Sequence, residues 1–195
     1  MIDLEKIILE SIEVKNKIIE KCMVSINKSN HILKKAIKNG NKIIWCGNGG
    51  SAADAQHMAA ELMGGLVSHD RKPIPSIALT TDTSFITAWS NDTSYESIFS
   101  RQVEGLGNPG DVLIAISTSG NSVNIINAIN SAVKKNIKII ILTGQTGGLM
   151  SGLGNVKICV PSKNTQRIQE GHLLIEHLLC ESLESWFLNM HLDSK

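Results

Sequence analysis

Two polar side chains four residues apart, His57 and Glu61, are the first candidates for chemistry in this 195-residue chain. Four residues turn an α-helix through about 400°, so the two project from nearly the same face, roughly 6 Å apart along its axis. An imidazole and a carboxylate at this spacing could bind a metal ion together with other ligands. The alternative is a solvated surface pair, which is the commoner role of this spacing.

A second group of candidates lies near the C-terminus, where a helix is predicted from about Thr165 to Met190. Gln169 and His177 are eight residues apart, which is roughly 12 Å along a regular helix and about 80° around it. Zinc–ligand bonds are only about 2 Å long. Both side chains could reach one ion if the helix began after Gln169, or if they came from different subunits. His172 equally suits a buried core or interface position.

The segment Gly47-Asn48-Gly49-Gly50-Ser51 has the composition of a ligand-binding loop. Its glycines let the backbone turn tightly and approach a ligand, and we expect Ser51 to cap the helix that follows. The segment lacks the lysine of a P-loop and the third glycine of a dinucleotide fingerprint. A tight strand-to-helix turn without a ligand is the alternative.

The segment Ser117–Ser122, called the serine loop below, places four hydroxyl groups and a glycine where another helix is predicted to begin. Hydroxyl groups and free N–H groups at a helix start form a neutral cradle for phosphate. No lysine or arginine lies in this loop, which suits a phosphate that anchors a substrate and is not transferred. A capped turn is the alternative, although capping needs fewer hydroxyls.

Short apolar runs alternate with helical stretches in the rest of the chain, and near-continuous apolar runs are typical of strands buried on both faces. Residues 3–38 carry helical periodicity, as one helix or two, up to the break at Asn39-Gly40. The predicted strands are Lys42–Cys46, Ser76–Leu79, Val112–Ser117, Ile137–Leu142 and Val156–Val160. The predicted helices between them are Ser51–Met63, Tyr95–Leu106 and Ser122–Asn136.

This alternation predicts an α/β fold with a parallel, doubly wound sheet. We expect one domain over residues 1–195, with a helical arm at 1–39 and a core at 40–190. Ligands bind such sheets beyond the carboxyl ends of the strands, at a topological switch point. The segment Gly47–Ser51, called the glycine loop below, and the serine loop both follow predicted strands and therefore belong to that edge.

Composition excludes several classes of protein. Hydrophobic residues are 42% and charged residues 19%, which is typical of a globular domain. The net charge of +1 gives no sign of a nucleic-acid-binding surface. No apolar run approaches the roughly 20 residues that span a bilayer, and the N-terminus does not resemble a signal peptide. The four cysteines are far apart, so we expect reduced thiols and a cytoplasmic protein.

Several of these segments together resemble one family. The stretch Gly47–His57 resembles the opening motif of the bacterial phosphoheptose isomerases, members of the sugar isomerase (SIS) family. Asn91-Asp92, the serine loop, and Arg167–Glu170 with His177 are similar to its later motifs, in the same order. The resemblance spans roughly residues 40 to 190. Gly65 departs from the family, since many relatives have arginine there, and the surroundings of Asn91-Asp92 also differ.

The resemblance implies a three-layer αβα sandwich with a five-stranded, flavodoxin-like sheet. It implies a homotetramer with active sites at subunit interfaces and one Zn²⁺ per subunit. The reaction it implies converts sedoheptulose 7-phosphate to D-glycero-D-manno-heptose 7-phosphate, the first step toward ADP- or GDP-heptose and lipopolysaccharide. It makes Glu61 and His177 the catalytic pair, and His57, Glu61, Gln169 and His177 the zinc ligands. The residues it assigns to substrate are Asn48, Gly49, Gly50, Ser51, Asn91, Asp92, Ser117, Thr118, Ser119, Ser122 and Gln169.

The implied chemistry suits these residue types. Ketose–aldose isomerisation moves a proton between C1 and C2 through an enediol, so it needs a base on carbon, here Glu61. An imidazole such as His177 can exchange the oxygen-bound protons near neutral pH. Zinc could polarise the carbonyl. Direct zinc ligation would weaken Glu61 as a base, so we expect it to be loosely held or released when substrate binds.

Two alternatives remain. A relative of these isomerases is a non-catalytic regulator that binds the bacterial replication initiator, and its loops are similar. That regulator does not keep the side chains that match Glu61 and His177, which favours the enzyme. Another sugar-phosphate isomerase of the same family is the second alternative, and the pattern from Arg167 to His177 argues against it.

Overall fold

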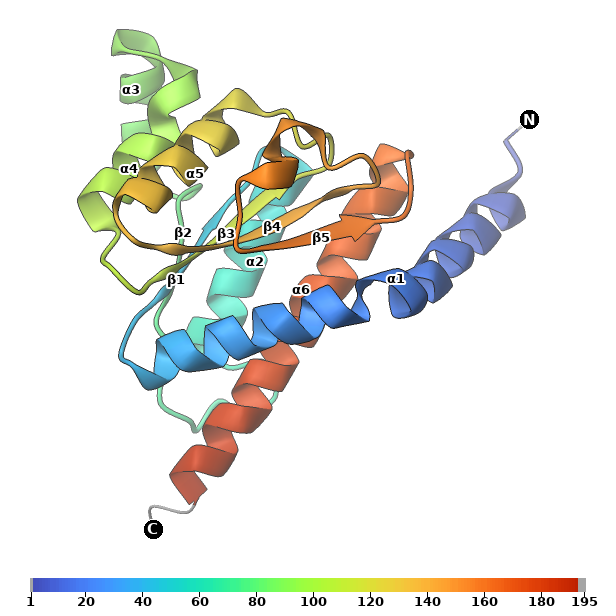
Figure 1. Ribbon diagram of the computed structural model, residues 1–195, viewed down its shortest axis with the longest axis horizontal. Coiled ribbons are helices and arrows are strands. Elements are labelled where there is room, and N and C mark those ends of the chain that lie inside the picture. The colour runs from blue at the N-terminus through green and yellow to red at the C-terminus, as the bar shows by residue number, and fades with distance from the viewer. Residues whose placement is uncertain (1, 193–195) are drawn as a thin grey trace.

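The computed structural model describes residues 2–192 and contains a five-stranded parallel sheet of strand order β2-β1-β3-β4-β5 (Figure 1). This is the flavodoxin-like order, with its switch point between β1 and β3. Each strand overlaps the run that predicted it, and β4 continues two residues further than expected. The strands are β1 Ile43–Cys46, β2 Ser76–Ala78, β3 Val112–Ser117, β4 Lys138–Gly144 and β5 Val156–Val160.

Helices cover both faces of the sheet, which confirms the predicted three-layer α/β architecture (Figure 1). The helices are α1 Leu4–Lys38, α2 Gly50–Gly64, α3 Thr83–Asp92, α4 Ile98–Leu106, α5 Val123–Lys134 and α6 Thr165–Leu192. Two short 3₁₀ turns, η1 Tyr95–Ser97 and η2 Gly148–Gly152, lie between them. In the described part of the chain, no helix combines the length and apolar content that a membrane crossing requires.

Alternate residues along each strand point to opposite faces and build two separate cores. On β1, Ile43 and Trp45 belong to the core under α1, α2 and α6, whereas Ile44 and Cys46 belong to the core under α4 and α5. All four side chains are fully buried. This double burial is the physical reason why the strands appear in the sequence as continuous apolar runs.

The N-terminal arm is a single helix of 35 residues and not two. Asp3 caps it by accepting a hydrogen bond from the Lys6 N–H, and Gly40, at φ 78°, lies in the turn that ends it. Its buried stripe begins only at Val14, so the first turns extend past the edge of the sheet (Figure 1). The boundary predicted between arm and core falls in the turn between α1 and β1, and the division itself stays a prediction.

Three sequence-based expectations differ from the structure. Ser51 is not an N-cap, because α2 already begins at Gly50 and Gly49 precedes it as the cap residue. The helix expected over Tyr95–Leu106 divides into η1 and α4. Helix α3 was missed, since it has no buried residue and therefore no apolar periodicity to detect.

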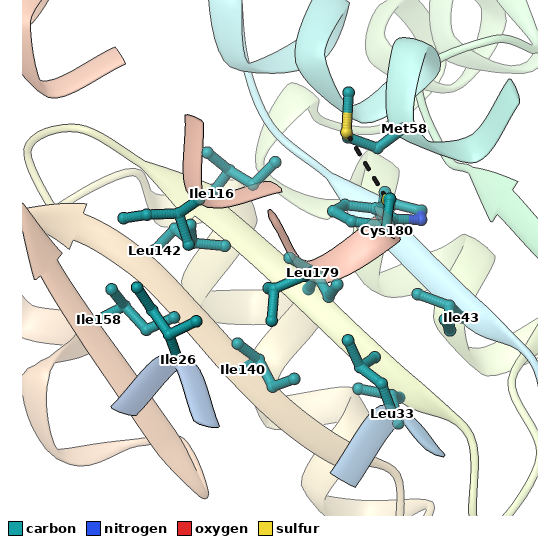
Figure 2. Packing of buried hydrophobic residues seen from close by; sticks show 14 of the residues in the cluster. Ile26, Leu33, Ile43, Met58, Ile116, Ile140, Leu142, Ile158, Leu179 and Cys180 are labelled. Carbon is teal, nitrogen blue, oxygen red and sulfur yellow. Dashed lines mark hydrogen bonds between the residues drawn. The ribbon is translucent and has the colours of Figure 1, made fainter. Parts of the chain in front are cut away.

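Figure 2 shows the buried side chains through which α1, α2 and α6 pack against one face of the sheet. In this view Ile26 of α1 lies beside Ile158 of β5, and Leu33, further along α1, lies between Ile140 of β4 and Ile43 of β1. Met58 of α2 and Cys180 of α6 approach each other, with 3.7 Å between their sulfur atoms. This buried contact fixes the distance between the two helices that carry His57, Glu61 and His177.

We expect Leu33→Ala to lower the free energy of unfolding by about 2–5 kcal/mol, because it opens a cavity under α1 that the neighbouring side chains only partly fill. Leu33 is 1% exposed in the native protein. Urea unfolding at one fixed protein concentration measures the loss. Lys35→Ala, an exposed position on the same helix, is the matched control and should change stability little; equal effects of both substitutions would contradict this account.

Candidate active site

The loop after β1 needs glycine at two positions. A Cβ atom on Gly47 would lie 2.5 Å from the backbone oxygen of Ser51, a distance that no side chain tolerates. Gly49 has φ 55°, a left-handed conformation that favours glycine. The chain can therefore leave the sheet and enter α2 within four residues, which brings the helix start close to the switch point.

Three of the predicted side chains lie together between α2 and α6. Nε2 of His57 is 3.0 Å from Oε1 of Glu61, as the four-residue spacing predicted. The rings of His57 and His177 meet edge-on, with 5.0 Å between centroids and 79° between planes. Nδ1 of His177 lies 2.9 Å from the carbonyl oxygen of Leu173, so Nδ1 carries a proton and donates it. In the neutral ring, Nε2 then keeps a free lone pair.

Gln169 joins this cluster through Asp54, which the sequence analysis did not select. Both carboxylate oxygens of Asp54 accept from Nε2 of Gln169, at 2.8 Å each. Because α6 begins at Thr165, the idea that the helix starts after Gln169 is wrong. Instead, Asp54 and His57 lie one turn apart on α2 and contact Gln169 and His177 respectively. Gln169 and His177 thus lie roughly 12 Å apart along one continuous helix, so both can reach one ion only if they come from different subunits.

Asp54 is a carboxylate in a nearly dry position, with 5% of its surface exposed. Burial raises its pKa, and the hydrogen bond from Gln169 and the nearby rings of His57 and His177 oppose that rise. The sequence does contain a pattern that could have identified Asp54 as a site residue. Positions 54, 57 and 61 share one helical face, so the face that carries the His–Glu pair also carries Asp54.

His172 and Glu176 on α6 are fully buried titratable residues. Among the described residues, their ring nitrogens and carboxyl oxygens have no hydrogen-bond partner; the Thr143 backbone lies near the His172 ring, outside bonding geometry. Burial lowers the pKa of His172 to about 4. Burial and the nearby charge of Asp54 raise the pKa of Glu176 well above its usual range. Burial therefore disfavours the charged form of each side chain, and His172 occupies a core position.

A pair of asparagines joins the loop after β1 to the first turn of α5, which follows the serine loop. Asn48 donates to Oδ1 of Asn124 at 2.9 Å, and Asn124 donates back to Oδ1 of Asn48 at 2.8 Å. The phenol of Tyr95 donates to the same Asn48 oxygen at 2.9 Å. These bonds hold the two segments together at the switch point. Sequence reasoning selected neither Asn124 nor Tyr95, because neither stands in a pattern that indicates its partner.

The hydroxyl groups of the serine loop bond mainly to one another. Oγ of Ser117 is 2.9 Å from Oγ of Ser122 and 3.5 Å from Oγ of Ser119. Ser117 and Ser119 also accept from the backbone N–H groups of Gly120 and Asn121. Ser122 precedes α5, but its side chain makes no capping bond. The loop is thus internally braced, and the start of α5 has no cap from that hydroxyl.

Asn91 and Asp92 lie apart from this cluster. They end α3, are exposed, and bond to each other, with 2.8 Å between Asn91 Nδ2 and Asp92 Oδ1. Figure 1 shows α3 projecting beyond α4. Within residues 2–192, no hydrogen bond connects either residue to the other predicted site residues. Their assignment to substrate stays a prediction.

The polar residues at the start of α6 contact two different helices, α1 and α2. The guanidinium of Arg167 pairs with the carboxylate of Glu170 and donates to the carbonyl oxygen of Ile7 at 3.2 Å. Ser11 donates to Glu170 at 2.8 Å. Arg167 and Glu170 therefore fasten α6 to α1, while Gln169 turns toward α2.

A buried ion pair fixes the end of α2 near Glu61. Nε of Arg71 is 2.5 Å from Oε1 of Glu184 on α6, and both side chains are 2% exposed. Arg71 also donates to the carbonyl oxygen of Glu61 at 2.9 Å. Glu184 accepts from the N–H groups of Leu66 and Val67. Burial acts to raise the pKa of Glu184, but these hydrogen bonds hold it below its usual value.

The turn between α2 and Arg71 depends on Gly65. This residue has φ 113°, and a Cβ atom there would lie 2.4 Å from the backbone oxygen of Ser68. The present conformation therefore excludes any side chain at the position where many relatives have arginine.

The donor atoms between α2 and α6 fit zinc by type. Zinc binds imidazole nitrogen and carboxylate oxygen, and Nε2 of His177 keeps its lone pair. Because Nε2 of Gln169 donates to Asp54, the amide oxygen, as assigned by this hydrogen bond, points elsewhere and remains available. In the described chain, no group of three or more His, Cys, Asp and Glu side chains is arranged to hold a metal ion. A complete set of ligands that includes both Gln169 and His177 would therefore draw on more than one subunit.

Known proteins share this fold and much of this sequence. A family model for the SIS domain matches residues 8–144. A phosphoheptose isomerase of Shewanella oneidensis is 51% identical over 178 residues, which cover 90% of each chain. The structure of the Neisseria gonorrhoeae phosphoheptose isomerase has a TM-score of 0.88 and 40% identity, and covers 93% of this chain and 97% of its own. A Francisella tularensis phosphoheptose isomerase has a TM-score of 0.90 and 37% identity, covering 95% and 100%.

The sheet order, the loops at its switch point and the family model together define a SIS domain protein. Within that class, the identity to several relatives is high over nearly the whole length. The chain belongs to the phosphoheptose isomerases of the SIS family, which confirms the resemblance found in its motifs.

We expect Arg71→Met to lower the free energy of unfolding by about 3–5 kcal/mol, because it leaves Glu184 buried without its cation. Arg71→Met combined with Glu184→Met removes both charges and should lose less. Urea unfolding of the wild type and both variants measures the difference. Arg101→Met, at an exposed arginine, is the control. A double variant no more stable than the single one would show that the unpaired charge is not the cause.

Proposed function

We propose that this protein converts sedoheptulose 7-phosphate to D-glycero-D-manno-heptose 7-phosphate through an enediol. The product would enter ADP- or GDP-heptose synthesis and supply surface polysaccharides such as lipopolysaccharide. The observation that carries the proposal is the meeting of His57, Glu61 and His177 between α2 and α6. It occurs in a chain that is 51% identical to a phosphoheptose isomerase.

Glu61 acts as the base on carbon. Its carboxylate would take a proton from C1 of the ketose and return it to C2, which gives the aldose. The contact with His57 holds the carboxylate toward α6, and the clamp from Arg71 to the Glu61 carbonyl oxygen fixes the backbone beneath it. A base that must meet one carbon and then its neighbour benefits from this restraint.

His177 manages the protons on oxygen. The hydrogen bond from Nδ1 to Leu173 fixes the orientation of the ring and leaves Nε2 to face the cluster. Nε2 can accept the proton of the C1 hydroxyl and deliver it to the oxygen on C2 as the enediol forms and collapses. Glu61 therefore transfers the carbon-bound proton, and His177 transfers the oxygen-bound proton.

The remaining predicted residues bind the sugar phosphate. The glycine loop, the serine loop and Gln169 would contact the substrate in active sites that lie at subunit interfaces. We also assign Asn91 and Asp92 to substrate, in keeping with the family motif. The braced hydroxyls of the serine loop suit a phosphate that stays in place while the other end of the sugar reacts.

We include one zinc ion per subunit in the proposal. His57, Glu61, Gln169 and His177 would hold it, and bound zinc would polarise the substrate carbonyl. The lone pair on Nε2 of His177 and the amide oxygen of Gln169 support this assignment. Because that lone pair can bind zinc or accept a proton but not both at once, His177, like Glu61, would be released from zinc when substrate binds.

We also propose a homotetramer in the cytoplasm. Exposed apolar side chains gather on the first turns of α1, where none of the other described residues covers them: Leu4 is 71% exposed and Ile8 61%. Exposed apolar surface of this kind is typical of subunit contacts. The four cysteines are free thiols, which suits a reducing compartment.

We expect Glu61→Gln and His177→Gln each to lower kcat/KM for sedoheptulose 7-phosphate by about 100- to 10,000-fold, since each removes one proton-transfer group. Formation of the aldose, followed by chromatography, measures the loss. Glu181→Gln, an exposed position on α6, should leave turnover unchanged. If the wild type does not turn over the substrate, with or without zinc, the chain is not this enzyme, and the non-catalytic regulator becomes the better account.

Removal of zinc should stop exchange of the carbon-bound proton with solvent and should be reversed by adding zinc. We would measure deuterium incorporation by NMR in chelator-treated and zinc-loaded protein. Metal content, measured by mass spectrometry, should fall in His57→Ala but not in His69→Ala. Undiminished exchange after complete chelation would remove zinc from the mechanism.

A further inference from the structure

A hollow of about 280 Å³ opens beside the serine loop. Its walls are the connections that follow β3, β4 and β5, so it lies at the carboxyl edge of the sheet. Side chains from all three connections line it, among them Thr118, Ser119, Gln145, Thr146, Lys163 and Thr165. Because the serine loop forms one wall, the hollow adjoins the proposed phosphate site.

Lys163 gives this hollow its charge. Among the described residues that line it, Lys163 alone is charged. Its ammonium group makes no hydrogen bond or ion pair with any described residue, and its side chain is exposed. The nearest carboxylate recorded along this connection, Glu10, lies by Asn164 at 3.4 Å and by Arg167 at 4.0 Å. The hollow is therefore electropositive, with a cation that no protein group neutralises.

The polar side chains around Lys163 are also available. The serine hydroxyls bond to one another and to the loop backbone. In contrast, the side chains of Thr118, Gln145 and Thr146 make no hydrogen bond with another described residue. The serine loop thus provides a rigid wall, and the unpaired donors lie on the connections that face it.

We propose that Lys163 binds the phosphate group of the substrate as its counter-charge. A phosphate ester carries about −1.5 to −2 charges near pH 7, and hydroxyl and N–H groups alone do not neutralise it. The serine loop itself contains no cation, so a positive side chain that adds to its neutral cradle would come from another segment. Lys163 is a binding residue in this account, and the inference rests on the proposed function only for the sugar that bears the phosphate.

The position of Lys163 is consistent with a substrate that extends along α6. Lys163 precedes the first turn of α6, Gln169 follows one turn later, and His177 lies roughly 12 Å beyond Gln169 along the helix axis. With the phosphate held between the extended Lys163 side chain and the serine loop, the sugar chain would point toward Gln169.

Lys163→Met should weaken binding of the phosphorylated substrate about 10- to 100-fold, the usual effect of losing one charged hydrogen bond. KM should rise and kcat should change little, since the reacting carbons are remote. Binding of inorganic phosphate, titrated by calorimetry, should weaken similarly and needs no turnover. Lys163→Arg should retain most of both. Lys138→Met, at the opposite end of β4, is the charge-matched control, and circular dichroism checks that each variant is folded.

Binding of inorganic phosphate and turnover of sedoheptulose 7-phosphate together distinguish a failure of this inference from a failure of the proposed function. Phosphate binding that depends on Lys163 in a protein without isomerase activity would support this inference and contradict only the proposed function. Turnover of sedoheptulose 7-phosphate with an unchanged KM in Lys163→Met would overturn the inference and leave the function standing. No binding of inorganic phosphate by the wild type, or equal binding by Lys163→Met, would also overturn it.

Discussion

The packing of α2 against α6 is the constraint on which the reactive cluster depends. Glu61 and His177 lie on different helices, so neither helix can hold the pair alone. Apolar and polar contacts alternate along this interface: the Asp54–Gln169 hydrogen bonds, the ring contact of His57 with His177, the sulfur contact beneath them, and the buried Arg71–Glu184 pair. A shift of one helical turn, about 5.4 Å, would break all of them together. The interface therefore specifies a single register.

The sheet controls the other end of the proposed substrate. A parallel sheet returns its chain through long crossovers, so that loops distant in the sequence meet at one edge. The glycine loop, the serine loop and the connection with Lys163 follow β1, β3 and β5 in this way. The asparagine pair and the internal bonds of the serine loop keep these loops in place. Helix packing and strand order thus place the two ends of one site independently.

The sequence predicted what local spacing encodes and missed what long-range contact decides. Five strands were found because double burial makes apolar runs, and His57 with Glu61 was found because four residues make one turn. The pairing of Asp54 with Gln169 crosses 115 positions, and that of Arg71 with Glu184 crosses 113. No local pattern records such partners. Ser51 was wrongly expected to cap α2 because the left-handed Gly49 starts the helix one residue earlier.

The first turns of α1 should be less stably helical in an isolated subunit than the turns that follow them. No described side chain before Val14 is buried, and polar contacts hold this segment to α6: Arg167 contacts the Ile7 carbonyl oxygen and Glu10, and Ser11 donates to Glu170. A helical segment this short is marginal by itself, so it persists by propagation from the anchored turns that follow. Amide hydrogens of residues 4–9 should therefore exchange with solvent fastest in α1 when the segment is bare, and slowly when another surface covers it. The exchange rate of these amides therefore reports whether the start of α1 is bound to another surface.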